Sequence, residues 1–368
     1  MILKFMARQC RVCGFPWLIS NVMSWNDNGT ITIVMQPEMK AVILHQGFID
    51  ALFSGIGARL GVSIEHIAFE AQRNAAKEVF DSTFNMIPGM RFALRFKPVK
   101  RFSVRYFNLV ASDCGMCHSD VVDFEGVKSG VSRITNPFYM PMLAANVVGA
   151  FEAMERVPYK AEWEESGPDT YMLKVEQTGE KPEIAQRMDL HIEPSLPGKG
   201  RLESCSHCRA PRGFSHLEWK PYDGMIIDSR TKSRVLLLDG HTVSAVFREI
   251  RRELGDEIDE LLMDAQRQWT IAHVSLLGLT PTTEPLSPEK LSEAYVEYLS
   301  MLPLHGHGNP VSFKAEDGSI ELVVENPYDP FLLAGTIKGL YEALEKTESD
   351  VSREEVRPGV SRFVLKPA

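Results

Sequence analysis

Two stretches of the chain repeat one another: "NPFYMPMLAANVVGAFEAMER" at 136–156 and "NPYDPFLLAGTIKGLYEALEK" at 326–346. An Asn-Pro pair, a Leu-Ala pair, a glycine and a Glu-Ala pair recur at a constant offset of 190 residues. After an early proline, each stretch carries apolar residues at helical spacing, which predicts a helix that begins just beyond Asn-Pro. A repeat of this length indicates a tandem duplication.

The similarity continues upstream in the same order. "LGVSIEHIAFEAQR" at 60–73 matches "LGDEIDELLMDAQR" at 254–267, and "CRVCGFP" at 10–16 matches "CSHCRAP" at 205–211. Each copy is therefore predicted to contain a CxxC knuckle, a β-hairpin, two helices, further strands, a last helix and a closing strand. We predict an α+β fold with antiparallel sheets, present twice and related by pseudo-two-fold symmetry.

The boundary between the copies is predicted from composition. A segment over 179–202 is rich in Glu, Pro and Gly and lacks apolar periodicity, as a linker should. The first unit is then 1–178 and the second is 203–368.

Composition limits the classes of function. The chain has 368 residues, of which 44% are hydrophobic and 24% are charged, so it is long enough for two domains with cores of their own. A net charge of −9 disfavours general nucleic-acid binding. We find neither the ~18 consecutive apolar residues of a membrane span nor the apolar core of a signal peptide. A cytoplasmic protein without a membrane partner is expected.

Segments of the second copy resemble a known family. "RVLLLDG" at 234–240, followed by a helix and "ELGDEIDELLMDAQR", resembles the opening module of the input domains of aromatic-responsive transcription activators. "SIELVVENP" at 319–327, the last helix and "PGVSRFVLKP" at 358–367 resemble the 4-vinyl reductase domain, a small hydrocarbon-binding domain that follows in those sensors. The resemblance implies an α+β domain, often dimeric, that encloses a hydrophobic ligand pocket between helices and sheet.

The chain departs from that family at one site. The sensors hold a zinc ion with cysteines and a glutamate around the final helix and the next strand. The corresponding stretches at 159–174 and 349–366 contain no cysteine, although Glu162 and Glu165 remain. That ligand set is not carried over, and neither an ATPase module nor a DNA-binding helix-turn-helix pattern supports a transcription activator.

The six cysteines form three CxxC pairs, which in a reducing compartment indicates metal ligation or redox chemistry. Pseudo-symmetry would place the equivalent knuckles face to face, so that Cys10, Cys13, Cys205 and Cys208 share one ion. Four thiolates favour Zn²⁺ or an iron centre. Two alternatives remain open: pairing of each knuckle across a homodimer, or reduced dithiols without metal.

A second constellation starts from "SDCGMCHSD" at 112–120. Its counterpart in the second copy is "HGHG" at 305–308, so Cys114, Cys117, His305 and His307 are candidates for a mixed site of two thiolates and two imidazoles. The alternative is a pair of solvated loop histidines. Cys114 to His118 also has the spacing of a c-type haem attachment site, and the two cysteines could form a redox dithiol.

A basic aromatic segment, "MRFALRFKPVKRFSVRYF" at 90–107, carries six cations and no acid. It could receive an anionic head group, an acidic partner or a nucleic-acid strand, or it could be an amphipathic element whose cations are solvated. We take Arg91, Arg95 and Phe96 from this segment as candidate ligand contacts. Tyr139 and Met140, near the first copy's last helix, are candidates for an apolar pocket.

The sequence thus predicts a metal-containing protein, with zinc as its metal, that binds a small hydrophobic or aromatic molecule or a protein partner of that pathway. The alternative is an enzyme or redox accessory that uses Cys114 and Cys117 with an iron–sulfur centre, a haem or a reactive dithiol. Among common catalytic motifs, we find no GxSxG, HExxH, P-loop or GxGxxG pattern in its required context, so no catalytic residue is predicted.

Overall fold

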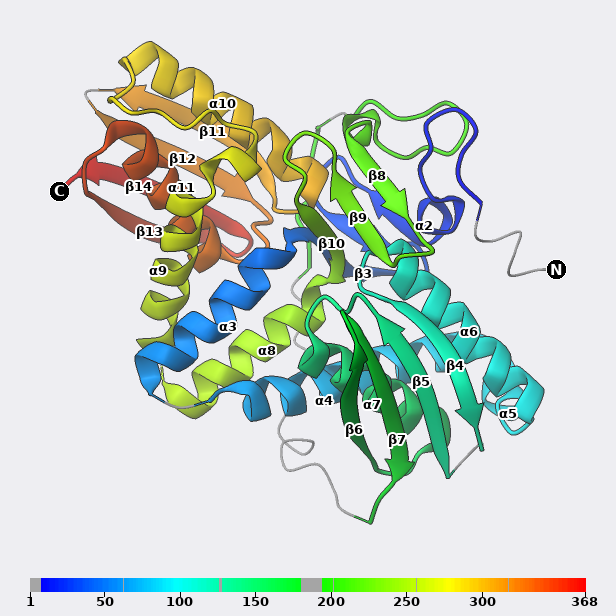
Figure 1. Cartoon of the computed structure of the whole chain (residues 1–368). Coiled ribbons are helices and arrows are strands. Elements are labelled where there is room, and N and C mark those ends of the chain that lie inside the picture. The colour runs from blue at the N-terminus through cyan, green and yellow to red at the C-terminus, as the bar shows by residue number, and fades with distance from the viewer. Residues whose placement is uncertain are drawn as a thin grey trace.

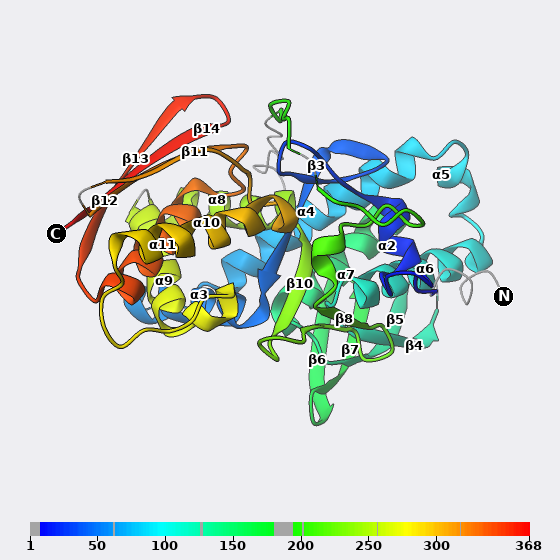
Figure 2. The same cartoon turned by 90° about the horizontal axis from the view of Figure 1, so that it is seen from above.

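The computed structural model describes residues 8–61, 63–125, 128–179, 194–200, 202–255, 257–316 and 318–368, and its elements are shown in Figures 1 and 2. The helices are α2 (Trp17–Val22), α3 (Gln46–Leu60), α4 (Glu65–Met86), α5 (Met90–Ala93), α6 (Lys97–Asp113), α7 (Met140–Glu155), η1 (Arg212–Phe214), α8 (Gly240–Leu254), α9 (Glu257–Ala272), η2 (Val274–Leu277), α10 (Pro288–His305) and α11 (Pro330–Glu345). The strands are β1 (Met23–Trp25), β2 (Ile31–Ile33), β3 (Gln36–His45), β4 (His118–Phe124), β5 (Ser129–Thr135), β6 (Tyr159–Gly167), β7 (Thr170–Gln177), β8 (Leu217–Lys220), β9 (Met225–Asp228), β10 (Arg234–Asp239), β11 (Asn309–Glu316), β12 (Ser319–Glu325), β13 (Ser349–Arg357) and β14 (Val360–Pro367).

A central sheet of six strands joins the two copies. Its order is β1-β2-β3-β10-β9-β8, so three strands come from each copy and the antiparallel pair β3–β10 lies at the middle. Ile43 pairs with Leu237, which is its own equivalent at an offset of 194 residues. A residue that pairs with its own equivalent must lie on the local two-fold axis, so the predicted pseudo-symmetry passes through this pair.

Each copy also has a four-stranded antiparallel sheet. The first has the order β4-β5-β7-β6 and the second the order β11-β12-β14-β13, so the two orders are equivalent strand by strand. The last helix of each copy packs on its own sheet, and the preceding long helix packs on that last helix: α4 on α7, and α9 on α11. The predicted α+β fold with antiparallel sheets is confirmed.

The two copies exchange parts. We call residues 8–60 and 202–254 the knuckle modules, and residues 65–177 and 257–367 the sheet modules. Helix α3 of the first knuckle module packs on α9 of the second copy, whereas α8 of the second knuckle module packs on α4 of the first copy. Figure 1 shows α3 and α8 side by side between the two sheet modules. The predicted boundary at 179–202 falls largely on residues outside the described ranges.

The repeated sequence letters have a structural reason. Arg73 of the "AQR" motif donates to Glu152 (Nε–Oε1 3.2 Å), and its equivalent Arg267 donates to Glu342 (Nη1–Oε2 2.6 Å). Each glutamate also accepts the backbone N–H that begins the next strand, from Tyr159 in the first copy at 3.0 Å. The ion pair therefore fixes the long helix, the last helix and the sheet against one another.

The basic aromatic segment is helical: it forms α5 and α6, with Pro98 in the first turn of α6. Within the described ranges, none of the helices combines the length and the apolarity that a bilayer crossing requires.

Candidate functional site

Four cysteine thiols from the two knuckles meet where the copies join. The Sγ atoms of Cys10 and Cys205 lie 4.0 Å apart, and those of Cys13 and Cys208 lie 3.4 Å apart. All four sulfur atoms lie within 4.8 Å of one another. Each of the two measured distances joins equivalent residues, so the cluster follows the pseudo-symmetry predicted from sequence. Cys13 is exposed and the other three are buried.

The two knuckles adopt the same tight turn. The backbone N–H of Cys10 donates to the Phe15 carbonyl at 2.8 Å, and that of Cys205 donates to the Ala210 carbonyl at 2.8 Å. Backbone N–H groups of Cys208 and then His207 also donate to the Cys205 sulfur, and these bonds lower its pKa to about 6. Burial instead raises the pKa of Cys13 and of Cys208. Donors directed at sulfur stabilise the thiolate, which is the form that binds metal.

The geometry of the cluster fits a tetrahedral ion. A Zn–S bond of about 2.3 Å implies sulfur atoms about 3.8 Å apart, and the two measured distances lie on either side of that value. The donors are four sulfur atoms, a set that suits Zn²⁺ or iron and not Mg²⁺ or Ca²⁺. The four cysteines could therefore hold a metal ion.

The two loops of the predicted mixed site lie on opposite edges of the β3–β10 ribbon. The Cys114 carbonyl accepts the Leu237 N–H at 3.0 Å, on the edge of β10 that β9 leaves unpaired. His307 Nε2 donates to the Ile43 carbonyl at 2.8 Å, on the corresponding edge of β3. The paired strands β3 and β10 therefore lie between the two loops. Cys114 and Cys117 consequently do not meet His305 and His307, and among the described residues the only metal-capable group is the four-thiol cluster.

In each knuckle module, one glycine allows a loop of the other copy to approach the backbone closely. A Cβ on Gly224 would lie 1.9 Å from the Cys117 carbonyl carbon, and a Cβ on Gly29 would lie 2.4 Å from that of Gly308. Both glycines have positive φ, 64° and 76°, so both the conformation and the close approach require glycine.

A large apolar cavity lies in the first copy. Its volume is about 360 Å³, within the range of small-molecule sites. Helices α4, α6 and α7 form much of the wall, and strands β3 and β10 bound one side. The wall includes Phe80, Val104, Phe107, Ala111, Val147 and Ala150. Met35 and Met86 also line it and are 53% and 41% exposed, so the cavity reaches the surface beside them.

Polar side chains interrupt the apolar wall, among them Gln36 and the amide pair of Gln72 and Asn146. Gln72, 4% exposed, donates from Nε2 to Asn146 Oδ1 at 2.6 Å. Its Oε1 has no hydrogen-bond partner in the described part of the chain. A buried acceptor left unpaired costs about 1–3 kcal/mol, and the amide faces a space in which a ligand atom could satisfy it.

Cys114 and Cys117 also line this cavity. Both are buried, and burial raises the pKa of Cys117 to about 12 and that of Cys114 further still. Both thiols are therefore protonated at neutral pH, whereas a reactive dithiol needs an accessible thiol of low pKa. The arrangement gives no support to nucleophilic or redox chemistry at this pair.

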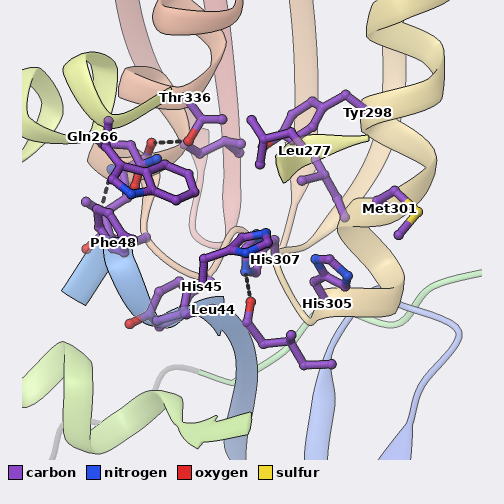
Figure 3. Close-up of a pocket in the computed structure, with 17 residues that line it drawn as sticks. Leu44, His45, Phe48, Gln266, Leu277, Tyr298, Met301, His305, His307 and Thr336 are labelled. Atoms are coloured by element: carbon purple, nitrogen blue, oxygen red, sulfur yellow. Dashed lines mark hydrogen bonds between the residues drawn. The ribbon is translucent and has the colours of Figure 1, made fainter. Parts of the chain in front are cut away.

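The equivalent space in the second copy is almost filled. Its volume is about 70 Å³, and Figure 3 shows Tyr298 and Met301 projecting from α10 toward it, with His45, His305 and His307 gathered at one end. Burial lowers the pKa of His45 and of His307 to about 4. The pKa of His305 also lies well below its usual value because this imidazole is buried. All three rings are therefore neutral at pH 7.

Larger side chains account for the lost volume. Where the first cavity has Ala111 and Ala150, the second copy has Leu302 and Leu340, at offsets of 191 and 190 residues. Where the first has Val104, the second has Tyr295, which is fully buried and donates to the Ile337 carbonyl at 2.8 Å.

None of the five candidate ligand contacts lines either cavity. Arg91 joins α5 to its surroundings, donating to Asp81 and, at 2.7 Å, to the Ala153 carbonyl. Arg95 and Phe96 lie on the outer surface, where Phe96 is 53% exposed.

The other two candidates lie at the start of α7. Tyr139 stacks on Phe53 with ring centroids 5.3 Å apart and donates to Glu65 at 3.2 Å. Met140 is buried in the main core.

The cavity lies against the last helix of the first copy, where an apolar pocket was predicted, but Tyr139 and Met140 themselves are not part of its wall. Gln72 was visible only as part of the repeated "AQR" motif. The contrast between Ala111 and Leu302, and between Ala150 and Leu340, was present in the aligned copies and is the signal that could have located the cavity.

Comparisons with known proteins give distant likenesses. No family model and no curated protein matches the chain. Among solved structures, it is similar to the phenol-responsive sensory domain of the transcription activator PoxR, crystallised with phenol, at 17% identity and a TM-score of 0.33, over 41% of this chain and 85% of that one. It is also similar to the I5F mutant of T. tengcongensis H-NOX, at 17% identity and a TM-score of 0.24, over 35% of this chain and 72% of that one. Likenesses at this level carry no weight for ligand or function.

Proposed function

We propose that the protein is a cytoplasmic, metal-containing binding protein that takes up a small hydrophobic or aromatic molecule in the cavity of the first copy. The cavity of about 360 Å³ carries this proposal, because the same space in the second copy is reduced to about 70 Å³. An open cavity lacks the packing contacts that a filled one has. The second copy shows that the fold can fill this space, so the open cavity of the first copy is retained for another reason.

The composition of the wall supports the ligand class. Phenylalanine, valine and alanine side chains contribute apolar surface, and the exposed Met35 and Met86 offer flexible side chains at the opening. The side-chain oxygens of Gln36 and Gln72, which both line the cavity and have no hydrogen-bond partner among the described residues, would offer polar contacts that orient a bound molecule.

We propose Zn²⁺ as the ion of the four-thiol cluster, with a structural role. The cluster joins residues 195 positions apart in the chain, and four thiolates leave no coordination position open for catalysis. The proposed cytoplasmic location accords with three CxxC pairs, since a reducing compartment keeps such thiols available for metal.

Binding of 2-naphthol, followed by its fluorescence anisotropy, tests the proposed cavity. We expect saturable binding to the full chain at one site. The double variant Ala111→Leu/Ala150→Leu introduces the residues of the second copy and should weaken binding at least about tenfold, because each added side chain occupies ligand volume.

A matched control alters the second cavity instead. Thr336→Val changes the residue equivalent to Asn146, and it should leave the affinity for 2-naphthol unchanged. Equal affinity of the wild-type chain and the doubly filled variant would show that the first cavity is not the binding site.

A further inference from the structure

Helices α5 and α6 form an outer face rich in exposed phenylalanine. Phe92, Phe96 and Phe102 are 62%, 53% and 43% exposed, and the rings of Phe92 and Phe96 meet edge to face with centroids 5.7 Å apart. Figures 1 and 2 place α5 and α6 at the end of the molecule opposite the sheet of β11–β14. Exposed apolar residues gathered on one face indicate an interaction surface.

The same face carries cations without carboxylate partners. Arg95, Lys97, Arg101 and Arg105 are exposed, and the structure shows no ion pair for any of them within the described ranges. Lys97, Arg101 and Arg105 are spaced four residues apart, so they share one side of α6. With Pro98 and Phe102 they line a shallow groove.

Two neighbouring cations do have carboxylate partners, so the lack of a partner is not general in the segment 90–107. Arg91 binds Asp81, and the buried Lys100 binds Glu155 at 2.6 Å (Nζ–Oε2). The structure therefore separates the cations of 90–107 into a paired inner set and an unpaired outer set, and only the outer set adjoins the exposed phenylalanines.

The second copy shows that packing does not require this surface. The equivalent helix α10 exposes Glu289, Glu293 and Glu297, and its only large exposed apolar residue is Val296. Glu293 stands where the first copy has Phe102, at an offset of 191 residues. A helix at the equivalent place in the same fold thus has an acidic outer face, so the basic aromatic face of α5 and α6 serves something outside the core.

We propose that the outer face of α5 and α6 docks on an anionic lipid surface. Phenylalanine rings have no hydrogen-bonding groups and can enter the acyl boundary, while the adjacent arginine and lysine side chains meet lipid phosphates. The complementarity of charge is local, because the whole chain carries −9 and an anionic surface repels its other faces. The docking is thereby confined to this end of the molecule.

Two other occupants fit the face less well. The acidic α10 of a second copy matches the cations but offers only Val296 to three phenylalanine rings. A nucleic-acid strand would gain from aromatic stacking, yet the net charge of −9 opposes a polyanion that extends beyond this small face. The proposal does not depend on a ligand in either cavity.

Vesicle flotation of the full chain tests the proposal. We expect binding to phosphatidylcholine vesicles that contain roughly one-third phosphatidylglycerol, weak binding to pure phosphatidylcholine vesicles, and loss of binding at high salt. Arg101→Glu/Arg105→Glu should lower the partition coefficient at least about tenfold, since each cation near a charged surface contributes about fivefold. Phe92→Ser/Phe96→Ser should also lower it, because two inserted rings are lost.

The matched control is Lys290→Glu/Lys366→Glu, which makes the same change of charge at exposed positions of the second copy and should bind as the wild type does. All variants alter exposed residues, and circular dichroism checks that each is folded. Equal binding to neutral and anionic vesicles, or an equal loss in the control, overturns the proposal.

Two further results would assign the face to another partner and equally overturn the proposal. One is a change of solution mass in Arg101→Glu/Arg105→Glu, measured by light scattering, when the wild type binds no vesicles. The other is binding of a single-stranded oligonucleotide by a wild-type chain that binds no vesicles.

Discussion

The cavities of the two copies occupy equivalent places and differ about fivefold in volume, from about 360 to about 70 Å³. The scaffold around them is the same: equivalent sheets, equivalent long helices and equivalent Arg–Glu ion pairs. The difference arises from a few side chains, such as Leu302 and Leu340 in place of Ala111 and Ala150. Packing positions in this fold can therefore change without loss of the architecture.

The outer faces of the two copies diverge in the same way. Helix α6 is basic and aromatic outside, whereas α10 is acidic. The residues that hold the copies to each other have stayed equivalent, from the four cysteines to the glycine pair Gly29 and Gly224. Similarity thus marks what holds the copies together, and difference marks the proposed ligand cavity and the proposed docking face.

Metal removal should produce the largest effect, because both copies depend on the four-thiol cluster. If the ion is held at about a thousand times its dissociation constant, its loss lowers the free energy of unfolding by about 4 kcal/mol. We expect Cys10→Ser to abolish stoichiometric zinc, measured by atomic emission, and to lower the melting temperature. Cys114→Ser is the control, and a loss of zinc there would show that the cluster is not the metal site.

Substitution of alanine for Gly29 or Gly224 should cause the next largest loss of stability. Gly29→Ala and Gly224→Ala each place a Cβ inside the backbone of a loop of the other copy, and each should cost about 3 kcal/mol or more in urea unfolding. Gly61→Ala is the control: its φ is also positive, at 66°, but nothing lies within 4 Å of the added Cβ. A cost at Gly61 as large as at Gly224 would show that strain, and not the contact between copies, dominates.

Exchange of equivalent cavity residues should affect the two copies unequally. Leu340 is fully buried, so Leu340→Ala should lower the free energy of unfolding by about 2–5 kcal/mol. Ala150→Leu extends into the open cavity and should cost less than about 1 kcal/mol or increase stability. Chemical denaturation measures both, and equal costs would mean that the first cavity closes when the chain has no ligand.

Acid should have a smaller effect on stability per residue, and it should act at the second cavity, because His45, His305 and His307 line that cavity and no histidine of the described residues lines the first. A histidine in the unfolded chain has a pKa near 6.5, whereas burial lowers the pKa of His45 and His307 to about 4. Stability is therefore complete above the unfolded pKa and is lost as the pH falls toward the folded value. At about pH 5 each ring costs about 2 kcal/mol.

Unfolding of His45→Gln/His307→Gln at several pH values checks this dependence. The double variant should lose less stability than the wild type between pH 7 and pH 5. The residue equivalent to His307 is Met116, which takes up no proton, and the residue equivalent to His45 is Asp239. An unchanged slope would place the acid sensitivity elsewhere in the chain.

The fold followed from the sequence because duplication displays the same pattern twice. The helix after Asn-Pro, the hairpins and the closing strands all lie where the repeated periodicity predicted them. Symmetry also predicted the meeting of Cys10 with Cys205, because a two-fold axis joins equivalent residues. The exchange of modules was not predicted: the α3–α9 and α8–α4 contacts depend on the path of the chain across the axis, which local patterns do not encode.

The wall of the cavity was predicted only in part, for a related reason. The wall combines side chains of α4, α6 and α7 with strands of both copies, and its volume depends on which positions converge. The same symmetry argument gave the wrong prediction that Cys114 and His307 share a metal site. These residues lie close to equivalent places, but at the outer edges of the β3–β10 ribbon, far from the axis.

The pairing of Ile43 with Leu237 inside a single polypeptide has a consequence for evolution. In an assembly of two identical subunits, any mutation appears on both sides, so a substitution that closes one chamber closes the other. Here each chamber is encoded separately. The second copy could therefore fill its chamber with side chains while the chamber of the first copy remained free to change its ligand specificity.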